Sequence, residues 1–248
     1  MRAARLSIVI PAFNESRRLP ATLAAVADYA AGALEFAEVL VVDDGSRDET
    51  RVVAEGIAGQ FAAAPGGEAA RCVVRVLSHH PNRGKGASVR RGMLEATEAL
   101  ILMIDADLST PIEDLSKLLS ALDGAEIAIG SRALAGSQIT QRQSWFRESM
   151  GKVFNRLVQA VVLGGIRDTQ CGFKLFRSTA ARAIFSRTRI DGFAFDVEAL
   201  YLARRLGLRV AEVPVRWHNS PESTVHLVRD ASRMFTDLWR IRSVHRDL

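Results

Sequence analysis

Short apolar runs alternate with longer amphipathic segments along most of the chain. An apolar run of strand length is typical of a strand buried on both faces of a parallel sheet, whereas apolar residues that recur at helical spacing indicate a helix. The pattern predicts strands at about 6–10, 38–42, 72–77, 101–104, 126–130, 173–176 and 209–217. It predicts helices at about 16–31, 48–61, 87–97, 111–122, 144–163, 178–186, 196–206 and 225–242.

The order of these elements indicates the fold class. Strands and helices alternate through the first half, which favours an α/β fold with a parallel sheet and right-handed crossovers. Polar residues without periodicity at 133–143 indicate a loop. Because no repeat, low-complexity tract or convincing linker interrupts the chain, we expect a single domain over 1–248, with one half at 1–130 and the other at 131–248.

Polar side chains follow three of the predicted strands in the first half. Asn14 follows the first strand, Asp43 and Asp44 end the second, and Asp105 and Asp107 end the strand at 101–104. Open α/β sheets bind ligands at the carboxyl ends of their strands, so we expect these side chains to converge. Paired carboxylates suit a hard divalent cation such as Mg²⁺ or Mn²⁺, which often shares its oxygen ligands with a substrate diphosphate.

Each acidic motif also has a purely local interpretation. Carboxylates cap helices and fill turns, and the segment 109–111 (Ser-Thr-Pro) is itself a good helix start. Asp43 and Asp44 can likewise belong to a turn before the helix that Asp48 opens. An Asp-x-Asp triplet alone is weak evidence for a metal site, and the convergence of several polar strand ends is the stronger argument.

Composition narrows the classes of partner. A formal charge of +5 and a pI near 9.7 favour an anionic partner: nucleic acid, a membrane surface or a phosphorylated substrate. Aromatic residues make up only 6% and the arginines are spread, which disfavours nucleic acid. No run approaches the roughly 20 apolar residues that span a bilayer, so we expect any membrane contact to be peripheral. Cys72 and Cys171 form no disulfide framework, which favours a reducing compartment, and we expect Cys171 to be buried and not a nucleophile.

Four motifs resemble those of the family 2 inverting glycosyltransferases of GT-A fold. In order they are Pro11-Ala12-Phe13-Asn14-Glu15, Asp43-Asp44-Gly45-Ser46, Asn82-x-Gly-Lys85-Gly and Asp105-Ala106-Asp107. The more specific strings Asp168-Thr169-Gln170-Cys171-Gly172-Phe173-Lys174-Leu175-Phe176 and Phe195-Asp196-Val197-Glu198 resemble dolichyl-phosphate β-glucosyltransferases and bacterial polyprenyl-phosphate relatives. The resemblance implies a Rossmann-like, mostly parallel sheet with helices on both faces, a nucleotide-sugar half at 1–130 and a mixed acceptor half at 131–248.

The resemblance also implies roles for individual residues. Asp105 and Asp107 would hold Mg²⁺ or Mn²⁺, and Asp168 would orient the acceptor or the metal. A lipid phosphate acceptor is already mostly dianionic at neutral pH, so it scarcely needs a general base, whereas a sugar hydroxyl would need one. The remaining residues would contact the substrates: Pro11, Phe13, Asn14, Glu15, Asp43 and Asp44 the nucleoside, Lys85 the diphosphate, Arg132 and Arg147 the acceptor phosphate, and Gln170 and Lys174 the site generally. For Arg147 a solvated helix face is an equal alternative.

The expected activity is transfer of glucose from a UDP-sugar donor, UDP-glucose, to a polyprenyl phosphate at the inner, cytoplasmic face of a membrane. Alternatives are GDP-mannose as donor, a soluble acceptor, or a nucleotide-binding protein without turnover. We expect this protein to work without the membrane anchors of the family, because none of its apolar runs is long enough to be one. The basic amphipathic helix at 225–242 can lie on an anionic bilayer or cover the sheet, and we expect the latter. His79, His80 and His218 have no partner spacing and are interpreted as loop residues.

Overall fold

The computed structural model describes residues 4–63, 71–141, 151, 155–159, 162–218 and 227–247. Most of the helix expected at 144–163 therefore lies outside the described residues, and so does the candidate Arg147. No described helix combines the length and apolar character needed to cross a membrane.

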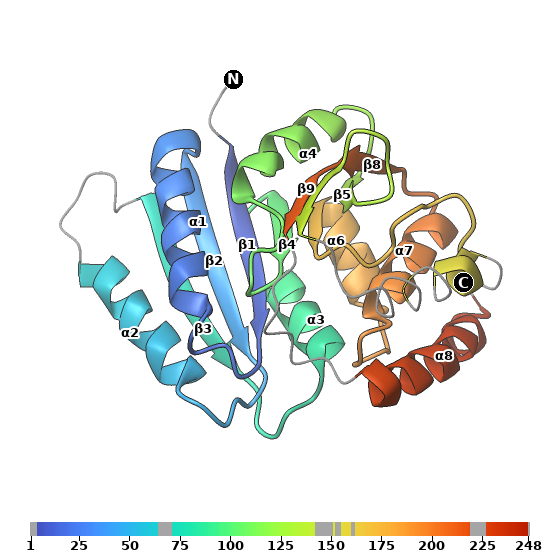
Figure 1. Cartoon of the computed structure of the whole chain (residues 1–248), viewed down its shortest axis with the longest axis horizontal. Coiled ribbons are helices and arrows are strands. Elements are labelled where there is room, and N and C mark those ends of the chain that lie inside the picture. The colour runs from blue at the N-terminus through green and yellow to red at the C-terminus, as the bar shows by residue number, and fades with distance from the viewer. Residues whose placement is uncertain are drawn as a thin grey trace.

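A seven-stranded sheet forms the centre of the molecule (Figure 1), with strand order β3-β2-β1-β4-β7-β5-β8. Its strands are β1 (Arg5–Ala12), β2 (Phe36–Asp43), β3 (Cys72–Ser78), β4 (Leu100–Ile104), β5 (Ile127–Ser131), β7 (Phe173–Arg177) and β8 (Val210–Pro214). All neighbours pair in parallel except β7, which runs antiparallel to both β4 and β5. The prediction of a mostly parallel α/β sheet is confirmed, and strands from both halves of the chain contribute to it.

Helices cover both faces of this sheet. One face packs on α1 (Leu19–Ala33), α2 (Thr50–Ala63) and α4 (Leu115–Ala121). The other packs on α3 (Lys85–Glu95), α6 (Ser178–Phe185), α7 (Phe195–Arg205) and α8 (Leu227–Val244). Neighbouring strand residues such as Leu102 and Met103 point to opposite cores, which is why the strands read as continuous apolar runs.

The segment 133–143 differs from the predicted loop. β6 (Gln138–Gln141) pairs in parallel with β9 (Arg216–His218) in a separate two-stranded sheet. The single strand expected at 209–217 is accordingly two strands, because the chain leaves the central sheet after Pro214, whose ring nitrogen carries no hydrogen to donate. A polar edge ribbon of this kind buries little apolar surface, so the hydrophobic pattern does not reveal it.

One element boundary differs from the prediction in a way that matters for the site. α3 begins at Lys85, two positions before the predicted start, and so places this lysine in its first turn.

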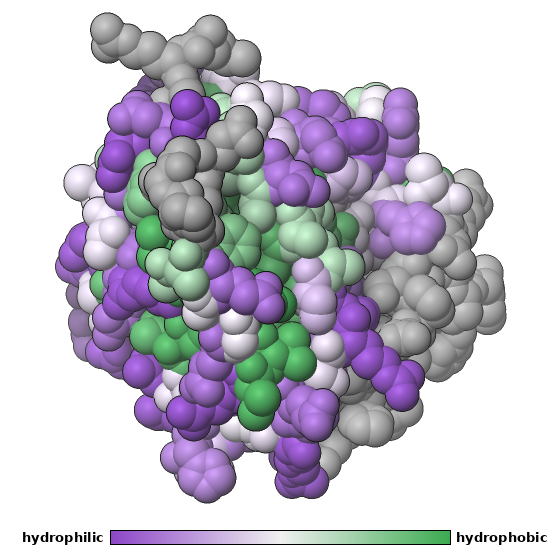
Figure 2. Space-filling view, turned by 90° about the vertical axis from the view of Figure 1, so that its left-hand side faces the viewer, coloured by the Kyte–Doolittle hydropathy of each residue, from purple (hydrophilic) through white to green (hydrophobic). Residues whose placement is uncertain are grey.

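β3 is the edge strand on the left of Figure 1, and Figure 2 shows that side of the molecule, where apolar side chains lie among polar ones. Val73 of β3 is 44% exposed and Val52 of α2 is 69% exposed.

Candidate active site

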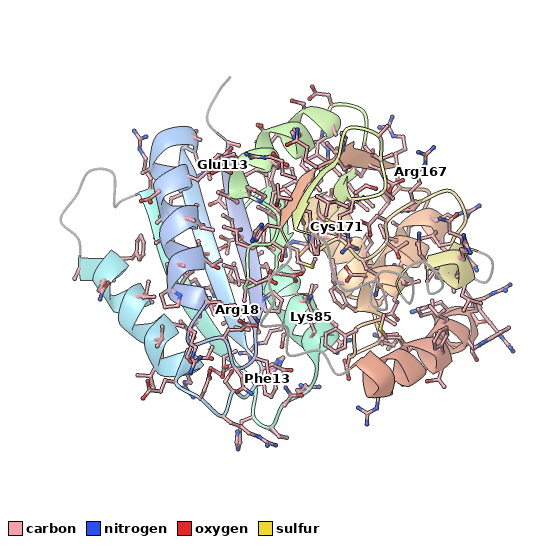
Figure 3. The ribbon with its side chains drawn as sticks, viewed as in Figure 1. Phe13, Arg18, Lys85, Glu113, Arg167 and Cys171 are labelled. Carbon is pink, nitrogen blue, oxygen red and sulfur yellow. The ribbon has the colours of Figure 1, made fainter. Side chains whose placement is uncertain are left out.

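A cleft of about 880 Å³ opens where β1, β2 and β4 end. Figure 3 shows Phe13, Arg18 and Lys85 at this end of the sheet. The first half of the chain lines the cleft with Pro11, Ala12, Phe13, Glu15, Asp44, Arg47, Asn82, Arg83, Gly84, Lys85, Ser88, Asp105, Ala106 and Asp107. The second half contributes Asp191, Gly192 and Phe193, together with Arg233, Met234, Thr236, Asp237 and Arg240 of α8. The structure thus brings Asp44, Asp105 and Asp107 of the predicted strand-end residues to one cleft, whereas Asn14 and Asp43 do not line it.

Asp105 and Asp107 stand just past the end of β4, and each faces a cation. Lys85 Nζ donates to Asp105 Oδ1 at 2.7 Å, and Arg18 Nη1 lies 3.8 Å from Asp107 Oδ2. Burial lowers the pKa of Lys85, but Asp105 and other nearby carboxylates raise it more, so it stays above its ordinary value. Lys85 is therefore a protonated lysine directed at the carboxylate pair.

Arg18 contacts two carboxylates that line the cleft, and the sequence did not single it out. Its Nε donates to Glu15 Oε2 at 2.7 Å, while its other end faces Asp107. Burial raises the pKa of Glu15, Arg18 opposes this, and the nearby Asp107 and Asp105 charges raise it further. Since Arg18 sits in the turn before α1 without any motif, no sequence signal distinguishes it from a solvated arginine.

Asp44 organises the loop that carries Lys85. Its Oδ1 accepts the Arg83 N–H at 2.9 Å and its Oδ2 accepts the Gly84 N–H at 2.7 Å. The His79 ring nitrogen Nδ1 lies 3.1 Å from the same carboxylate. His79 lies in the loop between β3 and α3, as predicted, but it is buried and has Asp44 as a partner. His218, also predicted in a loop, instead ends strand β9. Asp44 lines the cleft, but its carboxylate already interacts with Arg83, Gly84 and His79.

The loops after β1 and β2 support each other. Asn14 has a positive φ of 57°, a conformation that asparagine tolerates better than most residues. Its backbone N–H donates to Ser46 Oγ at 2.9 Å, and its side-chain oxygen accepts the Arg47 N–H at 2.8 Å. Asp43 Oδ1 accepts the Ser46 N–H at 3.2 Å, as expected for a turn. Asn14 and Asp43 are therefore engaged in loop structure, whereas Pro11, Phe13 and Glu15 line the cleft.

The 168–176 segment places Gly172 against Asp105. A Cβ atom on Gly172 would overlap the Asp105 carboxylate, so only glycine leaves room for this side chain in its present position. Pairing between β7 and β4 produces the approach, with Phe173 opposite Ile104. The 168–176 segment of the second half therefore provides the space in which the Asp105 carboxylate of the first half lies.

Asp168 and Arg132 form a bidentate ion pair beside the cleft. Arg132 Nε donates to Asp168 Oδ2 at 2.7 Å and Nη2 donates to Oδ1 at 2.9 Å. The Arg132 guanidinium also lies 5.5 Å from the centre of the Trp217 ring. Burial raises the pKa of Asp168, but Arg132 more than offsets this, and the pKa lies below its ordinary value. An ionised carboxylate held this way is suited to positioning and not to removing a proton.

Lys174 does not face the cleft, which corrects the expectation that it contacts substrate. The side chain is 1% exposed, and its ammonium donates to Asp196 Oδ1 and to the Cys171 carbonyl, both at 2.6 Å. Gln170 donates its backbone N–H to Asp168 at 3.2 Å and is not among the cleft-lining residues. Cys171 is buried, and burial raises the pKa of its thiol to about 11, as expected for a residue that is not a nucleophile.

The acidic pair is chemically suited to a divalent cation without enclosing one. Asp105 and Asp107 offer hard oxygen ligands at the cleft, and the missing Cβ of Gly172 leaves Asp105 its space. Within the described residues, no group of three or more His, Cys, Asp or Glu side chains could hold a metal ion. The remaining ligands would have to come from water and a bound diphosphate, an arrangement that Mg²⁺ commonly adopts.

Solved structures of other proteins share this α/β fold. A structure of glucosyl-3-phosphoglycerate synthase from Mycobacterium tuberculosis in complex with UDP matches with a TM-score of 0.69 at 18% identity, covering 97% of this chain and 80% of that one. Mannosyl-3-phosphoglycerate synthase from Rubrobacter xylanophilus matches with a TM-score of 0.68 at 18% identity, covering 97% and 73%. At this identity the likeness shows a shared fold.

Sequence comparison identifies the family. The model described as "Glycosyl transferase family 2" matches residues 7–185, and the chain belongs to this family of glycosyltransferases. Dolichyl-phosphate β-glucosyltransferase of Drosophila melanogaster is 43% identical over 226 residues, which cover 86% of this chain and 66% of that protein. The Homo sapiens protein of the same name is 38% identical over 229 residues, covering 86% and 67%. The chain thus spans about two thirds of the length of these relatives.

Proposed function

We propose that this protein transfers glucose from UDP-glucose to a polyprenyl phosphate of the dolichyl type, with inversion at the anomeric carbon, at the cytoplasmic face of a membrane. The names of the relatives support the acceptor and the sugar. A fold neighbour crystallised with Mn²⁺ and UDP-glucose supports the donor and a divalent ion. The observation that carries the proposal is the gathering of Asp105, Asp107 and Lys85 at the end of β4.

The chain's own residues account for most of the proposed chemistry. Phe13 and Glu15 would contact the nucleoside, and Lys85 would approach the diphosphate once a ligand competes for its pairing with Asp105. A divalent cation held by Asp105 and Asp107 would neutralise charge on the departing nucleoside diphosphate. An acceptor phosphate with a second pKa of about 6 is mostly dianionic at pH 7, so its oxygen can attack without a general base. The role of Asp168 in this proposal is to hold Arg132.

The proposal is tested by following radiolabelled sugar. Purified protein is incubated with labelled UDP-glucose, Mn²⁺ and a polyprenyl phosphate in detergent, and the label that partitions into organic solvent is counted. We expect lipid-linked glucose with UDP-glucose and little product with GDP-mannose. Label confined to the aqueous phase would contradict the lipid acceptor, and mannose transfer in place of glucose would contradict the donor.

Substitution of Asp107 tests the role of the acidic pair in transfer. Asp107→Ala should lower the transfer rate about 100-fold or more, because loss of charge stabilisation at the leaving group amounts to several kcal/mol. Asp123→Ala is the matched control, since Asp123 is an exposed acid that does not line the cleft. Equal activity of the two variants would show that Asp107 has no part in the reaction.

A further inference from the structure

α8 presents different residues to the cleft and to the core. Arg233, Asp237 and Arg240 follow one another at spacings of four and three residues, which places them on one side of the helix, and all three line the cleft. Leu238 and Ile241 point into the core and are almost fully buried. Residues Arg233 and Arg240 are exposed on the cleft wall.

Buried contacts hold α8 in place against the rest of the protein. His245, just after α8, has its ring nitrogen Nε2 2.7 Å from Glu198 Oε1. The same Glu198 carboxylate accepts the backbone N–H groups of Arg189 and Ile190 at 2.8 and 2.9 Å. Both His245 and Glu198 are buried. α8 and the segment that leads to Phe193 are therefore fixed to a common buried carboxylate, which favours a defined position for the cleft arginines.

Both halves of the chain bring cations to the cleft, and the exposed Arg47 and Arg83 of the first half line it beside the loops expected to hold the nucleoside. Of the described cleft-lining residues in the second half of the chain, Arg233 and Arg240 are the ones that carry positive charge. Lys85, on the opposite side, is paired with Asp105. Arg132 is held in a bidentate pair by Asp168 and is not among the cleft-lining residues. An anionic acceptor that enters on the side opposite the nucleoside loops therefore meets the guanidinium groups of α8.

Apolar side chains adjoin the two arginines. Met234, next to Arg233, and Phe193, from the segment before α7, both line the cleft and are half-buried. Asp237 lies between the arginines and offsets one of their charges, which leaves these three α8 side chains with a net charge of about +1, while Asp191 on the same side of the cleft is paired with Arg90. A monoester that joins a phosphate to an alkyl chain matches both the charge and the apolar surface, because the guanidinium groups bind phosphate oxygens and the apolar side chains cover the first carbons.

We propose that Arg233 and Arg240 of α8 bind the phosphate of a prenyl phosphate acceptor, with Met234 and Phe193 against its first isoprene carbons. This inference rests on the proposed function for the identity of the acceptor, and it adds the residues that receive it. The shared chemistry is a phosphate monoester, so lipid-linked and free phosphate must be distinguished by experiment.

Binding without turnover provides the test. Citronellyl phosphate, a short prenyl phosphate, is titrated calorimetrically into the full chain in the presence of UDP, so no sugar can be transferred. Loss of a charge-assisted contact to phosphate should raise the Kd about tenfold in Arg233→Ala or Arg240→Ala, and more in the double variant. Lysine at either position should restore part of the affinity. Arg246→Ala is the charge-matched control, because Arg246 is exposed just after α8 and does not line the cleft.

The outcomes separate this inference from the proposed function. An unchanged Kd for citronellyl phosphate in the double variant, with unfolding midpoints equal to wild type, would overturn the inference even if the enzyme transfers glucose. A changed Kd for UDP instead would assign the arginines to the donor. Equal affinity for inorganic phosphate and citronellyl phosphate would remove the apolar contact from the inference. Arginine-dependent binding without any glucose transfer would support the inference and overturn the proposed function.

Discussion

At the scale of single residues, the charged groups around the cleft are paired across long stretches of sequence. Lys174 pairs with Asp196, Arg132 with Asp168, and Lys85 with Asp105. An isolated charge cannot be buried cheaply, so each of these groups depends on its partner. The pairs in the interior hold the cleft walls, whereas Lys85 and Asp105 remain accessible to a ligand.

The Lys174 pair should be important for stability. Lys174→Met should lower the free energy of unfolding by about 3–5 kcal/mol, because it leaves the Asp196 carboxylate buried without a counter-charge. Lys117→Met serves as control, since Lys117 is 43% exposed and its partner Asp114 keeps a second ion pair with Arg216, and it should cost no more than about 1 kcal/mol. Urea denaturation measures both. A small and equal effect at the two sites would contradict the structural role of Lys174.

The Asp168 pair should make stability depend on pH in the acid range. The pKa of Asp168 is lowered in the folded protein from an ordinary value of 3.8, so its contribution is full above that pH and declines as the pH falls through the folded-state pKa. Asp168→Asn should cost about 2 kcal/mol or more at pH 7. The difference from wild type should shrink as the pH falls below about 4, in urea titrations at matched ionic strength. A difference that is constant with pH would rule out an ionised Asp168.

At the scale of elements, the start of α3 is where the two halves of the chain meet. The Gly86 N–H donates to the Asp191 carbonyl at 2.7 Å, and Arg90 of the same helix pairs with the Asp191 carboxylate. The Asp191 carbonyl thus satisfies an amide that would otherwise be available to a ligand phosphate. This contact fixes Lys85, one residue earlier, relative to the segment that leads to α7.

A methyl group at this contact should separate the two segments. A Cβ on Gly86 would lie 2.7 Å from Phe195 Cβ and would also overlap the Ile190 carbonyl. Gly86→Ala should therefore destabilise the protein by about 1–3 kcal/mol and lower activity. Gly56→Ala in α2 is the control, because nothing lies within 4 Å of its Cβ position, and alanine there should be neutral or stabilising by up to about 1 kcal/mol. Thermal unfolding compares the two variants, and a stable, active Gly86→Ala would refute the close contact.

At the scale of the whole molecule, the cleft is built from both halves around one sheet. The first half supplies the ends of β1, β2 and β4, and the second half supplies α8 and the segment before α7. A ligand that fills the cleft contacts both, so its binding energy should stabilise the complete fold. The two-stranded sheet of β6 and β9 joins this assembly through the His218 N–H, which donates to the Ser109 carbonyl just past the acidic pair.

Donor binding should therefore raise the unfolding temperature of the whole chain. UDP-glucose with Mn²⁺ at about 100 times its Kd contributes roughly 2.7 kcal/mol, which corresponds to a shift on the order of 5–10 °C for a chain of this size. GDP-mannose with Mn²⁺ should produce a much smaller shift. Differential scanning fluorimetry measures both, with Mn²⁺ alone as the reference. The absence of any shift with UDP-glucose would contradict its assignment as donor.

Much of the fold and part of the site could be predicted from the sequence. Continuous apolar runs such as 101–104 predicted buried strands because burial on both faces leaves no polar position in them. The acidic residues at the ends of those strands were expected to converge, because parallel strands bring their carboxyl ends to the same edge of a sheet. The roles of Arg147 and of the other substrate residues remain predictions.

Only the tertiary structure decided which of the candidate side chains face the cleft and which hold it from behind. Arg18, His79 and Arg233 carry no motif, and Lys174 stands in a specific motif yet is buried. The reason is physical: a sequence pattern records whether a residue is polar, but the partner that neutralises it is brought near by strand pairing and helix packing. For Lys174 that partner is Asp196, which is 22 positions away in the chain.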